Sequence, residues 1–349
     1  MTATATPADL DRLDDAELAD RLTEAGGRIR TEISKVIVGN DAIVEQALIA
    51  LFAGGNCLLV GVPGLAKTLL ISTMSRALAL SFSRIQFTPD LMPSDVTGTD
   101  VIQDDPETGR RRLIFMPGPV FANVLLADEI NRTPPKTQAA LLEAMQEYHV
   151  TAAGRTYQLD RPFFVLATQN PIELEGTYPL PEAQLDRFMF NIVMTYLSED
   201  DEVRVATATT STQKPAPARV LDGGEILQIQ DMVRQVLVAD DVARYAVRLV
   251  NASRPGREGR VGKLDFVDSW VRWGAGLRAS QALILGGKAR ALMQGRYHVS
   301  VADLRALAPP ILRHRVITNF YAESEHIDAD GIVTRLLDAV PGPKSGLET

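Results

Sequence analysis

The sequence is poor in the residues that stabilise small or metal-bound folds. Among its 349 residues it has one cysteine, Cys57, and therefore cannot form an internal disulfide. Its four histidines are scattered, and no cysteine or histidine spacing matches a zinc site. A net charge of −8 provides no general basic field for a polyphosphate backbone. These absences argue against disulfide-stapled folds, zinc sites and general nucleic-acid binding.

Long apolar runs are also missing. No run reaches the roughly 20 residues that a membrane helix requires, so we expect no membrane span. The acidic N-terminal residues 1–22 lack the basic and apolar regions of a signal peptide, so we expect a cytoplasmic location. Hydrophobic residues make up 46% of the chain and charged residues 23%, which is typical of a globular protein, and the length suggests two domains.

Short apolar runs alternate with helical patterns over the first 200 residues. The runs are 56–61, 84–87, 123–129, 163–170 and 188–194. Near-continuous apolar strands separated by helices predict an α/β fold, with a parallel sheet covered by helices on both faces. Two stretches, 98–115 and 148–160, break this alternation around the turn residues 105–109 and 153–154. We expect both to be hairpins that project from the core.

The remaining segments suggest how the chain is divided. Residues 8–36 have helical spacing, and a second helix is expected from Asn40 or Asp41 to Gly54. Residues 198–225 are rich in Thr, Ala, Pro and charge, and their middle is typical of a linker. Helical periodicity dominates after residue 223. The predicted parts are an N-terminal helical extension (1–36), an α/β core (37–200), a linker (201–222) and a helical domain (223–349).

The first chemical motif is GVPGLAKT at residues 61–68, directly after the apolar run CLLV. It matches the phosphate-loop pattern G-x-x-x-x-G-K-[ST] except at Ala66. Backbone N–H groups at a helix N-terminus bind phosphate, Lys67 would reach the β- and γ-phosphates, and Thr68 would ligate Mg²⁺. The alternative is a plain surface turn. The predicted nucleotide-binding positions here are Gly61, Pro63, Gly64, Leu65, Ala66, Lys67, Thr68 and Leu69.

Ala66 takes the place of a glycine that is needed where φ is positive or where a Cβ would strike the phosphate. Since Lys67 and Thr68 belong to the following helix, we expect Ala66 to adopt negative, helical φ in the first turn. Its methyl group would then point away from the phosphates.

Two strand ends provide further candidate residues. Asp128 and Glu129 end the run 123–129, which suits Asp128 to bind magnesium and Glu129 to activate water as a general base. The alternative is an acidic cap for the helix that follows. Asn170 ends the run 163–170 and is placed to orient the same water. On its own, Asn170 with Pro171 would be an ordinary turn.

These motifs together resemble the AAA+ ATPases, and most closely the MoxR family, from about Ile37 to the end of the chain. The resemblance rests on GVPGLAKT and on residues 84–98, 115–148, 163–188 and 308–316. Ala66 fits the family form G-x-P-G-x-A-K-T. The family implies ATP and Mg²⁺ as cofactors, a P-loop AAA+ core with the two hairpins inserted, and a small all-α lid domain.

The resemblance also implies roles for residues that are otherwise ordinary. Asn170 matches the first sensor, and Arg187 matches the arginine finger that reaches a neighbouring subunit. Arg278 matches the second sensor on the lid, although Gly276 and Leu277 replace the usual Ser-Pro before it. Val38 and Gly39 lie where the family passes the adenine. An arginine finger implies a homo-oligomer, and we expect a hexameric ring.

The expected function is a chaperone-like ATPase that remodels or matures partner proteins. The family suggests von Willebrand factor A domain proteins as partners, or metal-cofactor insertion. A magnesium-chelatase-like subunit is an alternative, as is a nucleic-acid motor that uses the basic tip at residues 110–112. A scaffold that binds ATP without turnover is a third alternative, which the complete set of motif residues disfavours. The client itself is not evident from the sequence.

Overall fold

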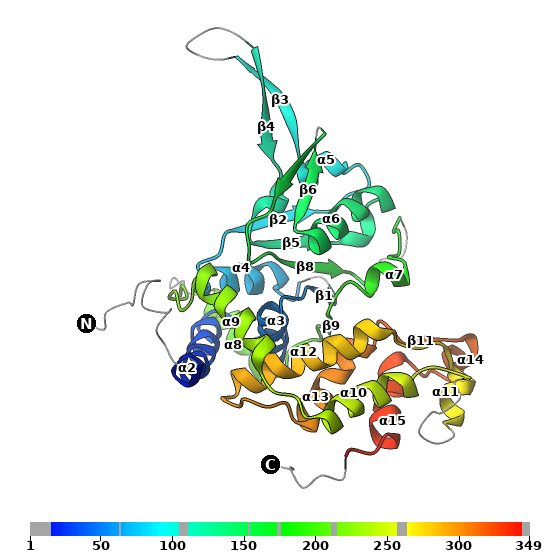
Figure 1. Ribbon diagram of the computed structural model, residues 1–349. Coiled ribbons are helices and arrows are strands. Elements are labelled where there is room, and N and C mark those ends of the chain that lie inside the picture. Colours follow the sequence, from blue (N-terminus) through cyan, green and yellow to red (C-terminus); the bar gives the residue numbers. More distant parts are fainter. Residues whose placement is uncertain are drawn as a thin grey trace.

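The computed structural model describes residues 15–62, 64–104, 111–152, 154–172, 176–210, 215–256 and 264–343. Five parallel strands form one sheet in the order β2-β5-β8-β1-β9, which confirms the α/β prediction (Figure 1). They are β1 (Cys57–Val60), β2 (Phe82–Gln86), β5 (Val124–Asp128), β8 (Phe164–Gln169) and β9 (Phe190–Val193). Because the strands are parallel, their carboxyl ends share one edge of the sheet, where ligands bind in such folds.

The three central strands β5, β8 and β1 are largely apolar because both of their faces are buried, whereas the edge strand β2 carries polar residues. One row of in-register side chains faces helices α5 and α6: Leu58, Ala127 and Ala167. The next row faces helices α2, α3 and α4: Cys57, Leu126 and Leu166. The helices are α2 (Asp15–Ser34), α3 (Asp41–Phe52), α4 (Lys67–Ala77), α5 (Pro93–Thr97) and α6 (Pro135–Glu147). Successive side chains along a strand therefore pack into the hydrophobic clusters on opposite faces of the sheet.

Both expected hairpins are present and stand out from the sheet (Figure 1). One joins β3 (Gly98–Asp104) to β4 (Arg111–Pro117), and the other joins β6 (His149–Ala152) to β7 (Arg155–Gln158). The rings of Phe115 and Tyr157 stack with centroids 3.9 Å apart, so the two hairpins support each other. The first turn (105–110, with Arg110 of the basic tip) and Ala153 lie outside the described residues.

The predicted helical domain is confirmed. Its helices are α9 (Gly223–Gln235), α10 (Asp240–Ala252), α11 (Asp265–Trp270), α12 (Leu277–Met293), α13 (Val301–Leu312), α14 (Phe320–Ser324) and α15 (Ala329–Ala339). Two short strands, β10 (Val271–Trp273) and β11 (Ile317–Thr318), pair antiparallel. Gly286 allows α12 to lie close to the core, since a Cβ there would be 3.1 Å from Leu307 and 3.2 Å from Met189. Helical domain and sheet thus share one hydrophobic core.

A buried carboxylate fixes the start of α13. Asp303 accepts hydrogen bonds from the guanidinium groups of Arg290 and Arg296 at 2.6 and 2.7 Å, and from the backbone N–H of Ser300 at 2.9 Å. Its side chain is fully buried, whereas the two arginines stay partly exposed. We refer to Asp303, Arg290 and Arg296 as the Asp303 cluster.

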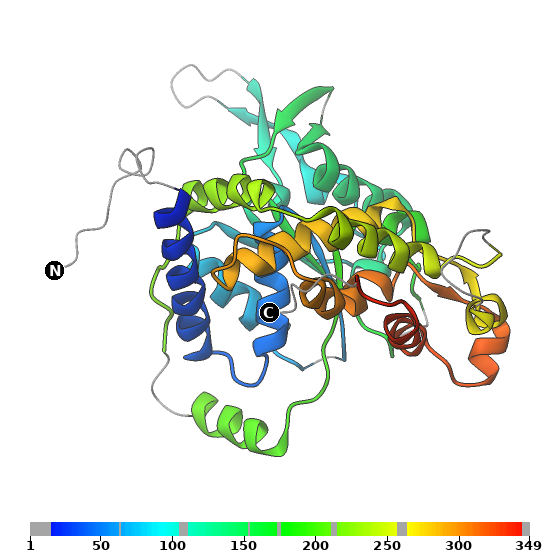
Figure 2. The same ribbon diagram turned by 60° about the horizontal axis from the view of Figure 1, so that its bottom comes forward.

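The first half of the predicted linker is not irregular chain. A helix, α8 (Glu199–Thr209), occupies the start of the segment and stands at the edge of the molecule (Figure 2). Ser198 caps it by accepting a hydrogen bond from the backbone N–H of Asp201, and acidic residues fill its first turn, where they complement the helix dipole. Irregular chain follows at 215–222. The domain boundaries themselves stay predictions.

The N-terminal extension is a helix where it is described. Its residues Ile29 and Ile33 are buried, and α2 packs against α4 and α12. Within the described ranges, no helix combines the length and the hydropathy needed to cross a membrane.

Candidate active site

The phosphate loop lies between β1 and α4, as its sequence predicts. The chain leaves the sheet at Val60, and α4 begins at Lys67. Gly64 has φ +86° and opens the turn. Pro63 lies outside the described residues.

The expected helical φ of Ala66 is wrong. Ala66 is the N-cap of α4 and is left-handed, with φ 56° and ψ 28°. A left-handed residue followed by the right-handed Lys67 forms a nest, in which successive backbone N–H groups point into one concavity that binds anions. The positive φ is therefore what this loop needs, and alanine adopts it against its intrinsic preference.

Lys67 extends across the loop. Its Nζ donates a hydrogen bond to the carbonyl oxygen of Gly61 and is half-buried. Burial lowers the pKa of the Lys67 ammonium group, and the negative charges of Asp128 and Glu129 partly oppose this effect. A phosphate group at the nest would give Lys67 a stronger, charged partner than the carbonyl it now holds.

Asp128 ends β5 beside the loop. Its Oδ1 accepts a hydrogen bond from the Thr168 hydroxyl at 2.6 Å, and its Oδ2 forms an ion pair with Arg84 at 2.6 Å. Arg84 belongs to β2, the neighbouring strand, and its side chain is 46% exposed. Arg84 is thus a cation already placed against the carboxylate that the sequence assigns to a metal.

Glu129 is left-handed, with φ 56°, and its backbone N–H donates to the Thr168 hydroxyl at 2.9 Å. Its carboxylate accepts from the Gln86 amide and pairs with Arg132, both at 2.9 Å. Helix α6 begins at Pro135 with Pro134 as its N-cap, so neither acid caps that helix. The capping alternative is wrong.

Asn170 lies just beyond β8 and is buried. Its Oδ1 accepts from the backbone N–H of Ile172 at 3.2 Å, and its Nδ2 has no partner among the described residues. A buried amide donor without a partner is costly, so we expect a ligand or water to complete it where Asn170 borders the cavity.

These groups surround one cavity of about 440 Å³, open to solvent. Its lining within the described chain is Gly64, Leu65, Ala66, Lys67, Thr68 and Leu69 of the loop and α4, Arg84 of β2, Asp128 of β5 with Glu129 just beyond it, and Thr168 of β8 with Asn170 just beyond it. The two predicted strand ends, at 128–129 and at 170, thus meet at the loop. The cavity combines cationic, anionic and amide groups, as a polyphosphate with a metal ion requires.

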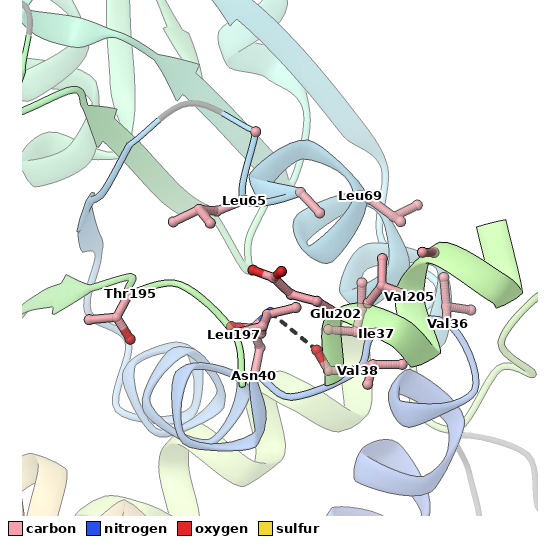
Figure 3. A pocket seen from close by; sticks show the side chains of 13 residues that line it. Val36, Ile37, Val38, Asn40, Leu65, Leu69, Thr195, Leu197, Glu202 and Val205 are labelled. Carbon is pink, nitrogen blue, oxygen red and sulfur yellow. Dashed lines mark hydrogen bonds between the residues drawn. The ribbon is translucent and has the colours of Figure 1, made fainter. Parts of the chain in front are cut away.

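A second, mainly apolar pocket of about 270 Å³ adjoins this cavity and shares Gly64, Leu65, Ala66 and Leu69 with it. Figure 3 shows Val36, Ile37 and Val38 on one side and Leu197 with Thr195 on another. Its size and lining suit a flat aromatic base. The carboxylate of Glu202 from α8 points into it, and no described residue hydrogen-bonds that carboxylate (Figure 3).

Val38 lines this pocket, while Gly39 is beside it. Gly39 has φ +73°, and a Cβ there would lie 2.8 Å from Oδ2 of Asp201. The positive φ favours glycine at this position, where the side chain of Asp201 from α8 approaches the backbone.

Arg187 and Arg278 lie elsewhere. Neither lines the cavity as the described residues define it. Arg187, half-buried, donates to the carbonyl oxygen of Leu142 at 3.2 Å, and the exposed Arg278 lies 3.4 Å from the carboxylate of Asp186. The chain brings the phosphate loop, both acids and Asn170 together, but not these two arginines.

Sequence reasoning missed four side chains at the site: Arg84, Gln86, Thr168 and Glu202. Thr168 lies inside an apolar run and Arg84 at the start of one, so neither residue is recognisable as functional from the sequence alone. The alternation of the strands provides a signal, because residues at a strand's carboxyl end face the loop. Glu202 gives no such signal, because the composition of α8 is typical of a linker.

Comparison with known proteins agrees with this geometry. The model of the ATPase family associated with various cellular activities (AAA) matches residues 56–190, and an AAA lid domain model matches residues 267–336. Chaperone MoxR1 of Mycobacterium tuberculosis is 43% identical over 313 residues, which cover 90% of this chain and 81% of that protein. Protein MoxR of Methylorubrum extorquens is 31% identical over 344 residues, covering 94% and 98%.

A crystal structure assigned as an ATPase, from Cytophaga hutchinsonii, superposes with a TM-score of 0.87 at 40% identity. The match covers 94% of this chain and 98% of that one. Core, lid and full-length relatives agree, and the chain belongs to the MoxR family of AAA+ ATPases.

Proposed function

We propose that this chain hydrolyses ATP with Mg²⁺ in the 440 Å³ cavity and uses the reaction to remodel a partner protein. One observation supports the chemistry above all: Lys67, Glu129 and Asn170, whose buried amide donor has no partner among the described residues, line the same cavity at the N-terminus of α4. The adjoining apolar pocket would hold the base.

The residues present fit a magnesium ion. Asp128 and Thr68 line the cavity and offer a carboxylate and a hydroxyl oxygen, the hard donors that Mg²⁺ prefers. Few protein ligands suffice, because Mg²⁺ keeps several waters and takes phosphate oxygens from the nucleotide. When bound, the ion neutralises charge on the β- and γ-phosphates. Arg84 would have to give up Oδ2 of Asp128, or share it.

The chain's own residues have distinct tasks. Backbone N–H groups of the nest and the Lys67 ammonium group bind the phosphates. Glu129 accepts the proton of the attacking water, and Asn170 orients that water through its amide. The Thr168 hydroxyl fixes both acids by donating to Asp128 and accepting from the Glu129 backbone.

A ring of identical subunits would complete the site. Arg187 and Arg278 do not line their own chain's cavity, and a trans-acting arginine stabilises the transition state in enzymes of this kind. A head-to-tail contact that closes gives a ring, and we propose a hexamer. The test is ATPase activity per subunit against protein concentration. Activity should fall on dilution into monomers, and a monomer with constant specific activity would refute the ring.

We propose a protein client, in keeping with the relative named Chaperone MoxR1. Von Willebrand factor A domain proteins and metal-cofactor insertion are the client classes expected from the family, and the cytoplasmic location stays a prediction. A Glu129→Gln variant that holds ATP without turnover should retain the client in a pull-down, whereas a Lys67→Ala control should not. ATPase stimulation by DNA or RNA that salt abolishes would favour the nucleic-acid motor instead.

A further inference from the structure

A buried arginine holds the segment that carries Arg187. Arg315 follows α13 in the lid, and its side chain is 4% exposed. Its guanidinium group makes five hydrogen bonds: Nε to Oδ1 of Asp186 (2.7 Å), Nη2 to the carbonyls of Asp186 (3.1 Å) and Phe188 (2.7 Å), and Nη1 to the carbonyls of Met189 (3.1 Å) and Ile311 (2.6 Å). A guanidinium group has five N–H donors, so Arg315 is fully used.

The carboxylate of Asp186 also contacts Arg278. While Oδ1 of Asp186 accepts from Arg315, its Oδ2 lies 3.4 Å from Nη1 of Arg278 at the start of α12. Asp186 therefore joins a buried arginine to an exposed one, and Arg187 is the next residue along the chain. We call Asp186, Arg278 and Arg315 the Asp186 bridge.

Arg313 and His314 also contact this part of the core from the lid, and neither of them bonds to Asp186. Arg313 donates to the carbonyl of Asn191 at 3.0 Å and pairs with Asp330 of the lid at 2.9 Å. His314 binds the carbonyl of Phe188 at 3.1 Å. Only Arg315, among these three neighbours, bonds to Asp186. Substitution of Arg313 is therefore a matched control, because it removes a contact between lid and core that does not involve Asp186.

We infer that Arg315 is a positioning residue: through the Asp186 bridge it fixes Arg187 and Arg278 for use in the next subunit's nucleotide site. The inference rests on the proposed function, in which these arginines act in trans. Because Arg315 belongs to the lid and four of its five hydrogen bonds go to residues 186–189 of the core, a displacement of the lid would move this segment with it. The alternative is that Arg315 only stabilises the contact between lid and core. Its loss would then lower the stability of the fold without a specific effect on the nucleotide site of the neighbouring subunit.

Mixed subunits distinguish these cases. Arg315→Met should lower ATPase activity on the order of tenfold or more, since misplacing a catalytic group by about 1 Å has effects of that size. Its own ATP binding should stay within about twofold of wild type. Arg313→Met should keep most of the activity. An equal mixture of Arg315→Met and Glu129→Gln subunits should restore activity to about a quarter of wild type. This is the share of interfaces at which an intact Glu129 meets a neighbouring subunit with an intact Arg315.

Two further variants keep the test decisive. An equal mixture of Arg187→Ala and Glu129→Gln should also recover. If it recovers but the Arg315→Met mixture does not, Arg315 acts on its own subunit, and the inference is overturned while the ring stands. If neither mixture recovers in assembled rings, the trans arginine itself is refuted. Should Arg315→Met not fold, Asp186→Asn preserves the backbone carbonyls that Arg315 binds, and the same recovery is required of it.

Discussion

Because Ala66 is left-handed, we predict that Ala66→Gly stabilises the protein. The helix propensity of alanine would predict the opposite. A left-handed φ costs an L-residue about 1–2 kcal/mol relative to glycine. Ala66→Gly relieves that strain and restores the general phosphate-loop pattern, but glycine also adds about 0.4–1 kcal/mol of unfolded-state entropy. The difference predicts a stabilisation on the order of 0.5–1 kcal/mol, measurable as a rise in the urea midpoint with an unchanged m-value.

Two other alanines provide matched controls. Ala79 also has positive φ, at 46°, and lies away from the cavity, so Ala79→Gly should stabilise to a similar extent. Ala243 lies inside α10 with helical angles, so Ala243→Gly should destabilise by about 1 kcal/mol. ATP affinity should be unchanged in all three. If Ala66→Gly destabilises as Ala243→Gly does, Ala66 is helical and the nest is wrong.

Three further expectations concern charged groups. Burial raises the pKa of the Asp303 carboxyl, but hydrogen bonds from its two arginines and Ser300 outweigh this and hold the pKa below its ordinary 3.8. The stability it gives is therefore present above that pH and lost as pH falls through the lowered pKa. Asp303→Asn should cost about 3 kcal/mol at pH 7 in urea unfolding, and the deficit should shrink below pH 3.8; a constant deficit would count against the cluster. Arg84→Ala removes a partly exposed competitor for Asp128 and should lower the Mg²⁺ concentration for half-maximal ATP binding about two- to fivefold. An increase instead would mean that Arg84 itself binds the phosphates. Glu202→Leu removes an acceptor for the adenine amino group and should weaken ATP binding about tenfold while sparing inosine triphosphate, which lacks that group; equal losses for both would show that Glu202 does not contact the base.

The sheet was predictable because each buried strand is a near-continuous apolar run. Asp128 and Asn170 could be placed together for the same reason: both follow such runs, and parallel strands end at one edge. The hairpins were evident from their turn residues, although residues 105–110 and Ala153 lie outside the described chain.

What the sequence could not reveal depends on backbone angles and on contacts across elements. The φ of Ala66 is set by the nest, against the helix propensity of alanine. Thr168 gains its role only because the register puts β8 beside β5, and Arg315 only because the lid folds back onto residues 186–189. The helix α8 was missed because its threonines and alanines suggested a linker, whereas its cap and its acidic first turn decide its structure.

The most direct test of the account is ATP turnover and ATP retention in wild type and in Glu129→Gln, measured on the same assembled protein. In Glu129→Gln, kcat should fall at least about a hundredfold, the usual contribution of a general base, while ATP affinity should stay within a few-fold. The Gln side chain keeps the shape of Glu129 and loses the acceptor charge, so assembly should persist. Unchanged turnover, or a loss of binding as large as the loss of turnover, would contradict the claim that this cavity hydrolyses ATP with Glu129 as its base.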